Sequence, residues 1–230
     1  MDTTGPVIRV LSYNVHGLGD DRDALAEVVR TLAPDVVLVQ EAPRRFRWRT
    51  RCADMAHAFG MLYGAGGEPS LGNVILTNHR VRVHDAWCLR YPLTPGRHMR
   101  GAAFAACSVE GVPFVAAVSH LATDGTERPA QGRLLKAAMA GVSEPLVLGC
   151  DLNDDPGSET WTALAHGLTD AGDEGGAPTF PAWNAKRRLD AIMVDPRATI
   201  RRFSVVDSEN VRRASDHLPI LCDMSVPVIT

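Results

Sequence analysis

Carboxylate, amide and imidazole side chains follow several apolar segments of this 230-residue chain at the point where each segment ends. Leu146–Gly149 is followed by Asp151 and Asn153, which are two residues apart and so point to the same side of an extended chain. An ionised carboxylate only accepts hydrogen bonds, whereas an amide both donates and accepts them. This pair fits the activation of a water molecule next to an anionic phosphoryl group. A calcium-binding loop is the alternative, but no Gly-x5-Glu sequence completes it.

Two earlier apolar segments also end in polar side chains of catalytic type. Asn14 and His16 alternate where Val7–Tyr13 ends, so they point the same way from an extended chain. Asn near Gly is also common in turns, which is the alternative for this pair. Glu41 follows the apolar run Val36–Gln40, where an ionised carboxylate is costly unless it is paired or binds a metal. The alternative for Glu41 is an acid that begins a helix.

Two histidines and two further acids complete the candidate set. His120 follows the apolar run Pro113–Ser119, where a purely structural histidine is the alternative. Asp190 begins another apolar run shortly after two arginines, so a salt bridge is its alternative. Asp216 and His217 are adjacent before the last apolar run. This order fits a metal-binding carboxylate beside an imidazole that a distant acid orients.

Short apolar runs alternate with helical patterns along the chain, and these elements must hold the candidate side chains in place. Alternation and turn signals predict strands at Val7–Tyr13, Val36–Gln40, Met61–Tyr63, Asn73–Thr77, Val81–Leu89, Ala102–Val109, Pro113–Ser119, Leu146–Gly149, Leu189–Val194, Ile200–Val206 and Leu218–Met224. Apolar side chains at helical spacing predict helices at Asp20–Leu32, after Pro43, at Thr126–Ala140 and near Ser158–His166. The helix after Pro43 is expected to bury Phe46, Cys52, Met55, Ala56 and Phe59. Turns or loops are expected at Gly64–Gly67 and Gly172–Pro181.

The mixture of strands and flanking helices predicts an α/β (α+β) fold in which two sheets pack together between helical layers. The strands between residues 61 and 119 follow one another closely, as in antiparallel sheets. Neither a repeat nor a linker divides the chain. We therefore expect one domain over residues 1–230.

Composition and charge restrict the class of protein. Hydrophobic residues make up 45% of the chain, which fits a globular domain and excludes a disordered chain, a collagen or a coiled coil. The net charge of -3 argues against bulk electrostatic binding of nucleic acid, since such domains usually have a pI above about 9. Five arginines fall between Arg44 and Arg51. Arginine recognises phosphate by bidentate hydrogen bonds, and the alternative for the cluster is a solvated helix face.

Cysteine usage and the N-terminus bear on the cellular compartment. The five cysteines are widely spaced and lack a CxxC pair, so we expect small buried hydrophobic side chains in a reducing compartment. Met1–Pro6 has neither the basic nor the apolar region of a secretory signal. No run approaches the ~18 apolar residues of a membrane span. The prediction is a cytoplasmic protein without a transmembrane segment and with no protein partner implied.

Taken in order, these motifs resemble the endonuclease/exonuclease/phosphatase superfamily, which has the deoxyribonuclease I-like fold. The matching segments span nearly the whole chain: SYNVHGLG (12–19), VVLVQEAP (36–43), LGNVILTN (71–78), VSHLATDGTERPAQ (118–131), LVLGCDLNDDP (146–156), RRLDAIMV (187–194) and ASDHLPI (214–220). The resemblance implies a four-layer α/β/β/α sandwich, with two mainly antiparallel sheets flanked by helices.

The resemblance also implies roles for individual side chains. Glu41, helped by Asn14 and Asp216, would hold a divalent cation, and hard oxygen ligands favour Mg²⁺ or Mn²⁺. Asp151 would orient or deprotonate the attacking water, and Asn153 would hydrogen-bond the phosphoryl oxygen. Asp190 would hold His217 in its tautomer, and His217 would stabilise the transition state. His120 would bind a phosphoryl oxygen or assist the leaving group. Apart from the resemblance, Arg97, Arg100 and Asn73 are further candidates for contact with substrate phosphate.

The chain also departs from part of the superfamily. Members that cut at abasic sites usually carry an acid where this chain has His16 and Tyr where it has His120, so the resemblance does not favour abasic repair or a second metal site. The sequence therefore predicts a metal-dependent phosphodiesterase or phosphatase acting on a phosphorylated small molecule, lipid head group or nucleic acid. A DNA or RNA nuclease and an inactive binding module are the alternatives. A serine hydrolase using Ser215 or Ser119 is disfavoured, because no GxSxG elbow is present.

Overall fold

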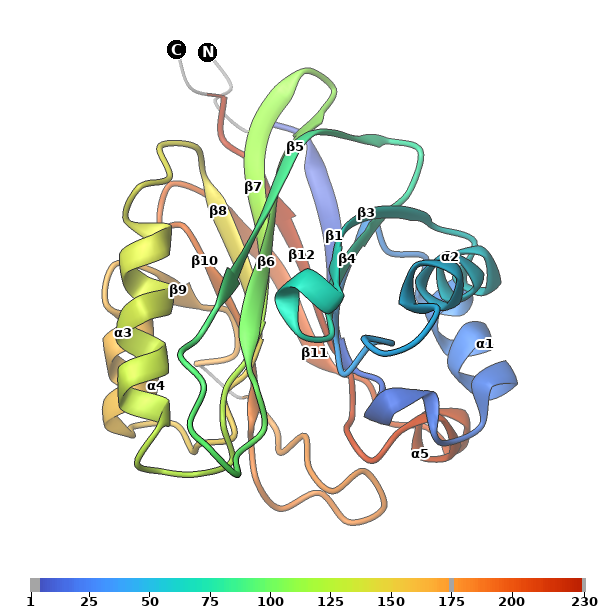
Figure 1. Ribbon diagram of the computed structural model, residues 1–230. Helices are drawn as coiled ribbons and strands as arrows, with labels where there is room; N and C mark the ends of the chain where they lie inside the picture. Colours follow the sequence, from blue (N-terminus) through green and yellow to red (C-terminus); the bar gives the residue numbers. More distant parts are fainter. Residues whose placement is uncertain (1–4, 174–175, 229–230) are drawn as a thin grey trace.

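Two six-stranded sheets form the centre of the computed structural model, which describes residues 5–173 and 176–228 (Figure 1). The first sheet has the order β11 (Thr199–Val205), β12 (Ile220–Ser225), β1 (Val7–Asn14), β2 (Val36–Gln40), β4 (Asn73–Thr77) and β3 (Leu62–Gly67). The second has the order β5 (Val81–Arg90), β6 (Gly101–Val109), β7 (Val112–His120), β8 (Leu146–Asp151), β10 (Asp190–Val194) and β9 (Thr169–Asp170). Two short 3-10 turns, η1 (His16–Leu18) and η2 (Glu68–Ser70), follow β1 and β3.

Each sheet is antiparallel except for one parallel pair, and these pairs bring functional residues to one edge. Strands β1 and β2 are parallel and are joined through helix α1 (Arg22–Leu32), whose first turn is capped by the Asp21 carboxylate. Strands β7 and β8 are parallel and are joined through helix α3 (Arg128–Met139). Parallel neighbours end on the same side of a sheet. The polar residues that follow β1 and β2 therefore lie close together, and so do those that follow β7 and β8.

Helices cover the outer face of both sheets and give the molecule four layers (Figure 1). Helices α1, α2 (Trp48–Phe59) and α5 (Glu209–Ala214) pack on the first sheet, where their apolar side chains form one core with β1 and β2. Helices α3 and α4 (Glu159–Ala165) pack on the second sheet around Phe104 and Leu148. A third core fills the space between the sheets. The predicted α/β/β/α sandwich with mainly antiparallel sheets is confirmed.

The two sheets approach closely at Gly149 in the middle of β8. A Cβ atom at this position would lie 2.8 Å from Leu38 Cδ1 and 2.8 Å from Ser12 Oγ, both on the opposite sheet. Only a residue without a side chain fits this contact. This close contact fixes the position of β8 relative to β1, and therefore also the positions of the residues at the ends of the two strands.

Replacing Gly149 with Ala is expected to lower the free energy of unfolding by about 1–3 kcal/mol, because the added methyl group overpacks the contact between the sheets. Urea denaturation measures the change. Gly141→Ala is the matched control, since the nearest atom to its new Cβ would be 3.9 Å away. Equal unfolding midpoints for the two variants would show that the sheets separate easily at this point.

The structure corrects several local predictions. The helix after Pro43 begins only at Trp48, so Phe46 lies before it and is 86% exposed instead of buried. The segment Gly64–Gly67 belongs to strand β3 and is not a turn. Cys88 is exposed because it lies on the edge strand β5, whereas the other four cysteines are buried. Helix α5 and the two-residue strand β9 were not expected, since each is too short to show a clear period.

No helix within the described residues is long and apolar enough to cross a membrane. Two predictions fall partly outside those residues. They are the absence of a signal at Met1–Pro6, where 1–4 are not described, and the loop Gly172–Pro181, where 174 and 175 are not described.

Candidate active site

The candidate catalytic residues meet at the edge where β1, β2, β7 and β8 end. Strand β10 runs antiparallel to β8, so its first residue, Asp190, is paired with Asp151, the last residue of β8. Asp151 is also level with His120 at the end of β7. Strand β12 starts opposite Ser12 of β1, which brings the segment before it to the same edge. The residues assembled in this way are Asn14, Glu41, His120, Asp151, Asn153, Asp190, Asp216 and His217.

Asp151 lies at the centre of this group and is buried. Its Oδ2 accepts a hydrogen bond from Asn14 Nδ2 at 2.9 Å, and its Oδ1 accepts one from the backbone N–H of Asn153 at 3.0 Å. Burial, together with the nearby Asp190 carboxylate, raises the pKa of Asp151 to about 6. A carboxylate with this pKa is ionised at neutral pH and is basic enough to take a proton from water in a transition state.

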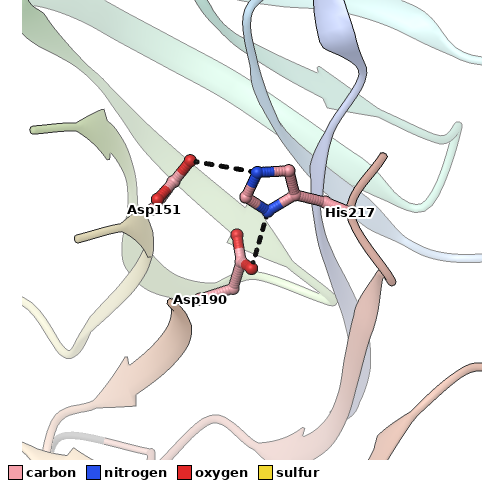
Figure 2. Close-up of side chains that lie close together, drawn as sticks. All are labelled: Asp151, Asp190 and His217. Atoms are coloured by element: carbon pink, nitrogen blue, oxygen red, sulfur yellow. Dashed lines mark hydrogen bonds and ion pairs between the residues drawn. The ribbon is translucent and has the colours of Figure 1, made fainter. Parts of the chain in front are cut away.

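His217 and Asp190 form a buried ion pair next to Asp151 (Figure 2). His217 Nδ1 is 2.9 Å from Asp190 Oδ2, and its Nε2 is 3.8 Å from Asp151 Oδ2. Burial opposes a charge on His217, but Asp190 and Asp151 outweigh it and raise its pKa to about 10. The ring also packs on Phe180, with 4.9 Å between the ring centres. His217 is therefore a fixed cation that can stabilise negative charge on a phosphoryl group.

His120 is buried and electrically neutral. Arg100 Nη1 donates to His120 Nδ1 at 3.0 Å, so the single ring proton of a neutral imidazole lies on Nε2. Asp151 Oδ2 lies 3.2 Å from this Nε2, and Asn153 Nδ2 lies 2.8 Å from it. Burial and the Arg100 charge hold the pKa of His120 well below its usual value. His120 is thus an uncharged imidazole at neutral pH.

Asn153 turns its amide back toward His120 and the end of β7. Its backbone has a φ of 52°, a left-handed conformation that Asn adopts more readily than most residues other than Gly. Its Nδ2 donates to the Leu121 carbonyl at 3.0 Å and lies 2.8 Å from His120 Nε2. This conformation places Asn153 beside both Asp151 and His120.

The residues predicted to bind a divalent cation lie on the more open side of the site. Among the described residues, the buried Oδ1 atom of Asp216 has no hydrogen-bond partner. Glu41 has a left-handed φ of 56°, and its Oε1 is 3.8 Å from His120 Nδ1. The side-chain oxygen of Asn14, Oδ1, accepts one hydrogen bond, from His16 N–H, and keeps a second lone pair. A buried carboxylate oxygen without a partner fits a hard cation such as Mg²⁺ or Mn²⁺, and Glu41 and Asn14 are the further candidate oxygen ligands.

A second group of potential metal ligands lies deeper in the site. One ligand atom each of Asp151, Asp190 and His217 falls within 4.8 Å of the others, and all three residues are buried (Figure 2). However, Asp190 holds His217 as a cation, and a protonated imidazole nitrogen has no lone pair to offer a metal. The arrangement favours the Glu41, Asn14 and Asp216 side for the cation.

The three residues predicted to contact substrate phosphate have different surroundings. Arg100 is buried against His120 in the site. Arg97 is half-exposed and pairs with Asp124 outside it. Asn73 Nδ2 donates to the carbonyls of Ser70 and Gly101, so neither of its N–H groups remains for a phosphate oxygen. An amide that looked available in the sequence thus supports the backbone in this structure, and its contact with substrate phosphate stays a prediction.

Several structural alternatives raised by the sequence can now be decided. Glu41 does not begin a helix, since α2 starts seven residues later. Asp190 pairs with His217, whereas the arginines before it pair with Asp155 and Asp170. The hydroxyls of Ser119 and Ser215 are buried and donate to backbone carbonyls, which excludes either as a nucleophile.

A cavity of about 320 Å³ opens beside Glu41 and His120. Four arginines line it: Arg44, Arg45, Arg51 and Arg100. The sequence identified the arginine cluster but gave no sign of which members would face the site. His98, which also lines the cavity, was not expected because it stands alone in a loop.

Comparisons with known proteins agree with the fold and the order of the motifs. The Endonuclease/Exonuclease/phosphatase family matches residues 11–217. A comparison with curated sequences gives no significant match.

Solved structures with this fold cover nearly the whole chain. A mannosyl-6-phosphatase of Bacteroides thetaiotaomicron is 18% identical, with a TM-score of 0.79 over 94% of this chain and 99% of that one. TDP2 of D. rerio, in complex with a single-strand DNA product, is 20% identical, with a TM-score of 0.77 over 96% and 99%. The human Nocturnin catalytic domain, with a bound sulfate anion, is 20% identical, with a TM-score of 0.76 over 97% and 96%. At these identities the likeness shows the fold.

Proposed function

The chain belongs to the endonuclease/exonuclease/phosphatase family, and from this premise we propose that it is a divalent-metal-dependent hydrolase of phosphate esters. The observation that carries the proposal is the buried contact of ionised Asp151 with a His217 cation held by Asp190. One group takes a proton and the other stabilises negative charge, which is what attack of water on phosphorus requires.

The reaction follows from the positions of these side chains. Asp151 orients a water molecule and accepts its proton as the water oxygen bonds to phosphorus. The phosphorus–oxygen ester bond then breaks, and the leaving oxygen takes up a proton to give the alcohol. Cationic His217 hydrogen-bonds a phosphoryl oxygen, whose negative charge grows in the transition state, while Asn153 and His120 hold the Asp151 carboxylate in place. A divalent cation held by Glu41, Asn14 and Asp216 would supply Lewis-acid stabilisation of that charge.

Hydrolysis of p-nitrophenyl phosphate and bis(p-nitrophenyl) phosphate tests the proposal. We expect release of p-nitrophenol with Mg²⁺ or Mn²⁺ and none with a chelator, since the metal is needed to offset charge on phosphorus. Which of the two compounds reacts faster separates a phosphatase from a phosphodiesterase. Equal rates for the wild type and an Asp151 variant would overturn the proposal.

Removing one proposed metal ligand should weaken cation binding without unfolding the protein. Glu41→Gln and Asp216→Asn are each expected to raise the Kd for Mn²⁺ by about 10–100-fold, because a neutral amide replaces a charged ligand. Isothermal titration calorimetry measures this directly. Glu68→Gln, which loses only a surface pair with Arg90, is the control. If Asp190→Asn raised the Kd for Mn²⁺ more than Glu41→Gln did, the cation would instead bind to the deeper group of Asp151, Asp190 and His217.

A nuclease is the second candidate, supported by one observation. Trp183 is 66% exposed, and its neighbour Ala182 donates through its backbone N–H to the Asp216 carbonyl, so an indole ring is available near the site for stacking on a base. Affinity for single-stranded DNA that falls steeply with salt would support this function. A protein that binds no divalent cation at millimolar concentration would instead be a binding module.

The cellular compartment, the domain organisation and the partner are proposed from the cysteines and the fold. All five cysteines are free, which suits a reducing, cytoplasmic compartment. We expect the family fold to be the one domain of the chain and its partner to be the phosphorylated substrate.

A further inference from the structure

The cavity beside the catalytic group is lined by Glu41 and His120, but its four arginines have no role in the reaction described above. We infer that it is a subsite for a second phosphate group, so that the substrate is a small organic phosphate ester carrying two phosphates. The inference rests on the proposed function, because it places the second phosphate beside the one that is hydrolysed. Four guanidinium groups line the cavity against one carboxylate, that of Glu41.

Among the described residues, these arginines differ from most others in having no acidic partner. Eleven other arginines of that part of the chain have a side-chain nitrogen within 4.0 Å of a carboxylate oxygen, as Arg97 does with Asp124. Within residues 5–173 and 176–228, no ion pair involves any of the four in the cavity. Four like charges beside a single carboxylate repel one another, and a bound anion relieves that repulsion.

Two of the four arginines are held rigidly, which prepares the cavity for a ligand. Arg44 Nη1 donates to the carbonyls of Leu71 and Met99, at 3.1 and 3.0 Å. Arg100 is only 9% exposed and donates to His120, while its Nε is buried without a partner among the described residues. Buried donors normally have acceptors, so the free Nε favours a bound anion. Guanidinium groups already in place lose little freedom when they bind phosphate.

The side chains of the other two cavity arginines, Arg45 and Arg51, make no hydrogen bond within the described part of the chain, so their guanidinium groups are available to a ligand. Arg47 and Arg49 belong to the same sequence cluster but do not line the cavity, and Arg49 instead lies over the Trp48 ring at 4.4 Å. The cluster therefore converges on a compact space and does not form a continuous track for a nucleic acid backbone. A cavity of about 320 Å³ suits a small molecule.

Two sugar phosphates that differ by one phosphate test the inference. We expect kcat/KM for fructose 1,6-bisphosphate to exceed that for fructose 6-phosphate by at least about tenfold, through charge-assisted hydrogen bonds to the second phosphate. Arg45→Gln and Arg51→Gln should each reduce this ratio by about tenfold. Arg47→Gln and Arg49→Gln, which remove the same charge outside the cavity, should leave the ratio as it is.

The outcomes separate failure of the inference from failure of the proposed function. The inference is overturned if the wild-type ratio is near one, or if Arg45→Gln and Arg51→Gln leave the ratio unchanged. The proposed function still holds in that case if p-nitrophenyl phosphate is hydrolysed. If no ester is hydrolysed, the proposed function fails, and calorimetric Kd values for the two sugars decide whether the cavity prefers the bisphosphate. Tighter binding of a single-stranded DNA oligonucleotide than of the bisphosphate, weakened equally by all four substitutions, would overturn the inference in favour of a nucleic acid surface.

Discussion

Asp151→Asn is expected to lower kcat by about 10³-fold or more and to leave the protein folded. The substitution keeps the size of the side chain but removes the group that accepts the proton of the attacking water, and general base catalysis contributes about 10²–10⁴-fold. The loss extends further, because the Asn153 and Asn14 N–H groups now meet an amide that accepts at only one of its two ends. Steady-state hydrolysis of bis(p-nitrophenyl) phosphate at saturating Mn²⁺ measures the effect.

The stability of this variant separates a chemical role from a structural one. Burial and Asp190 disfavour the ionised form of Asp151, so a neutral amide removes an electrostatic cost while losing one hydrogen bond. We expect the free energy of unfolding to change by less than about 2 kcal/mol. Asp155→Asn, four residues further on, removes an exposed pair with Arg187 and should leave kcat unchanged. A normal kcat for Asp151→Asn would remove this residue from the reaction.

The positions of the catalytic residues follow from features that the sequence already shows. Each apolar run predicts a strand, and a polar residue directly after it must lie at a sheet edge. Parallel pairing of β1 with β2 and of β7 with β8 then places Asn14, Glu41, His120 and Asp151 on the same side. The prediction of these elements needed only local patterns, which is why strand positions agree with the structure to within a few residues in most cases.

Contacts between distant segments could not be predicted in this way. The hydrogen bond from Arg100 to His120 depends on the register of β6 against β7, and no local pattern fixes it. Asn73 looked free at the start of a strand, but its N–H groups are taken up by Ser70 and Gly101. The direction of Arg45 and Arg51 depends on where helix α2 begins, which lies five residues after Pro43. Charge and spacing in the sequence therefore identified the arginine cluster, but they did not show that Arg44, Arg45 and Arg51 line one cavity with Arg100.

Asp190→Asn is expected to lower kcat by about 10²–10³-fold and to move the pH profile of kcat/KM to lower pH. In the wild type, Asp151 must be ionised and His217 protonated, so activity should rise as pH increases through about 6 and fall through about 10. Asp190 is the strongest attraction that holds the proton on His217, and it also raises the pKa of Asp151 by repulsion.

Without the Asp190 charge, only Asp151 and Asp216 still oppose burial at His217, so its pKa falls and activity is lost at a lower pH than in the wild type. The acidic limb should move down as well, since Asp151 no longer faces a second carboxylate. Rates measured from pH 5 to 11 show both limbs. Asp223→Asn, which loses a pair with Arg9 away from the site, is the control and should keep the wild-type profile. An alkaline limb that stays near pH 10 in Asp190→Asn would mean that His217 is not the cation on which the reaction depends.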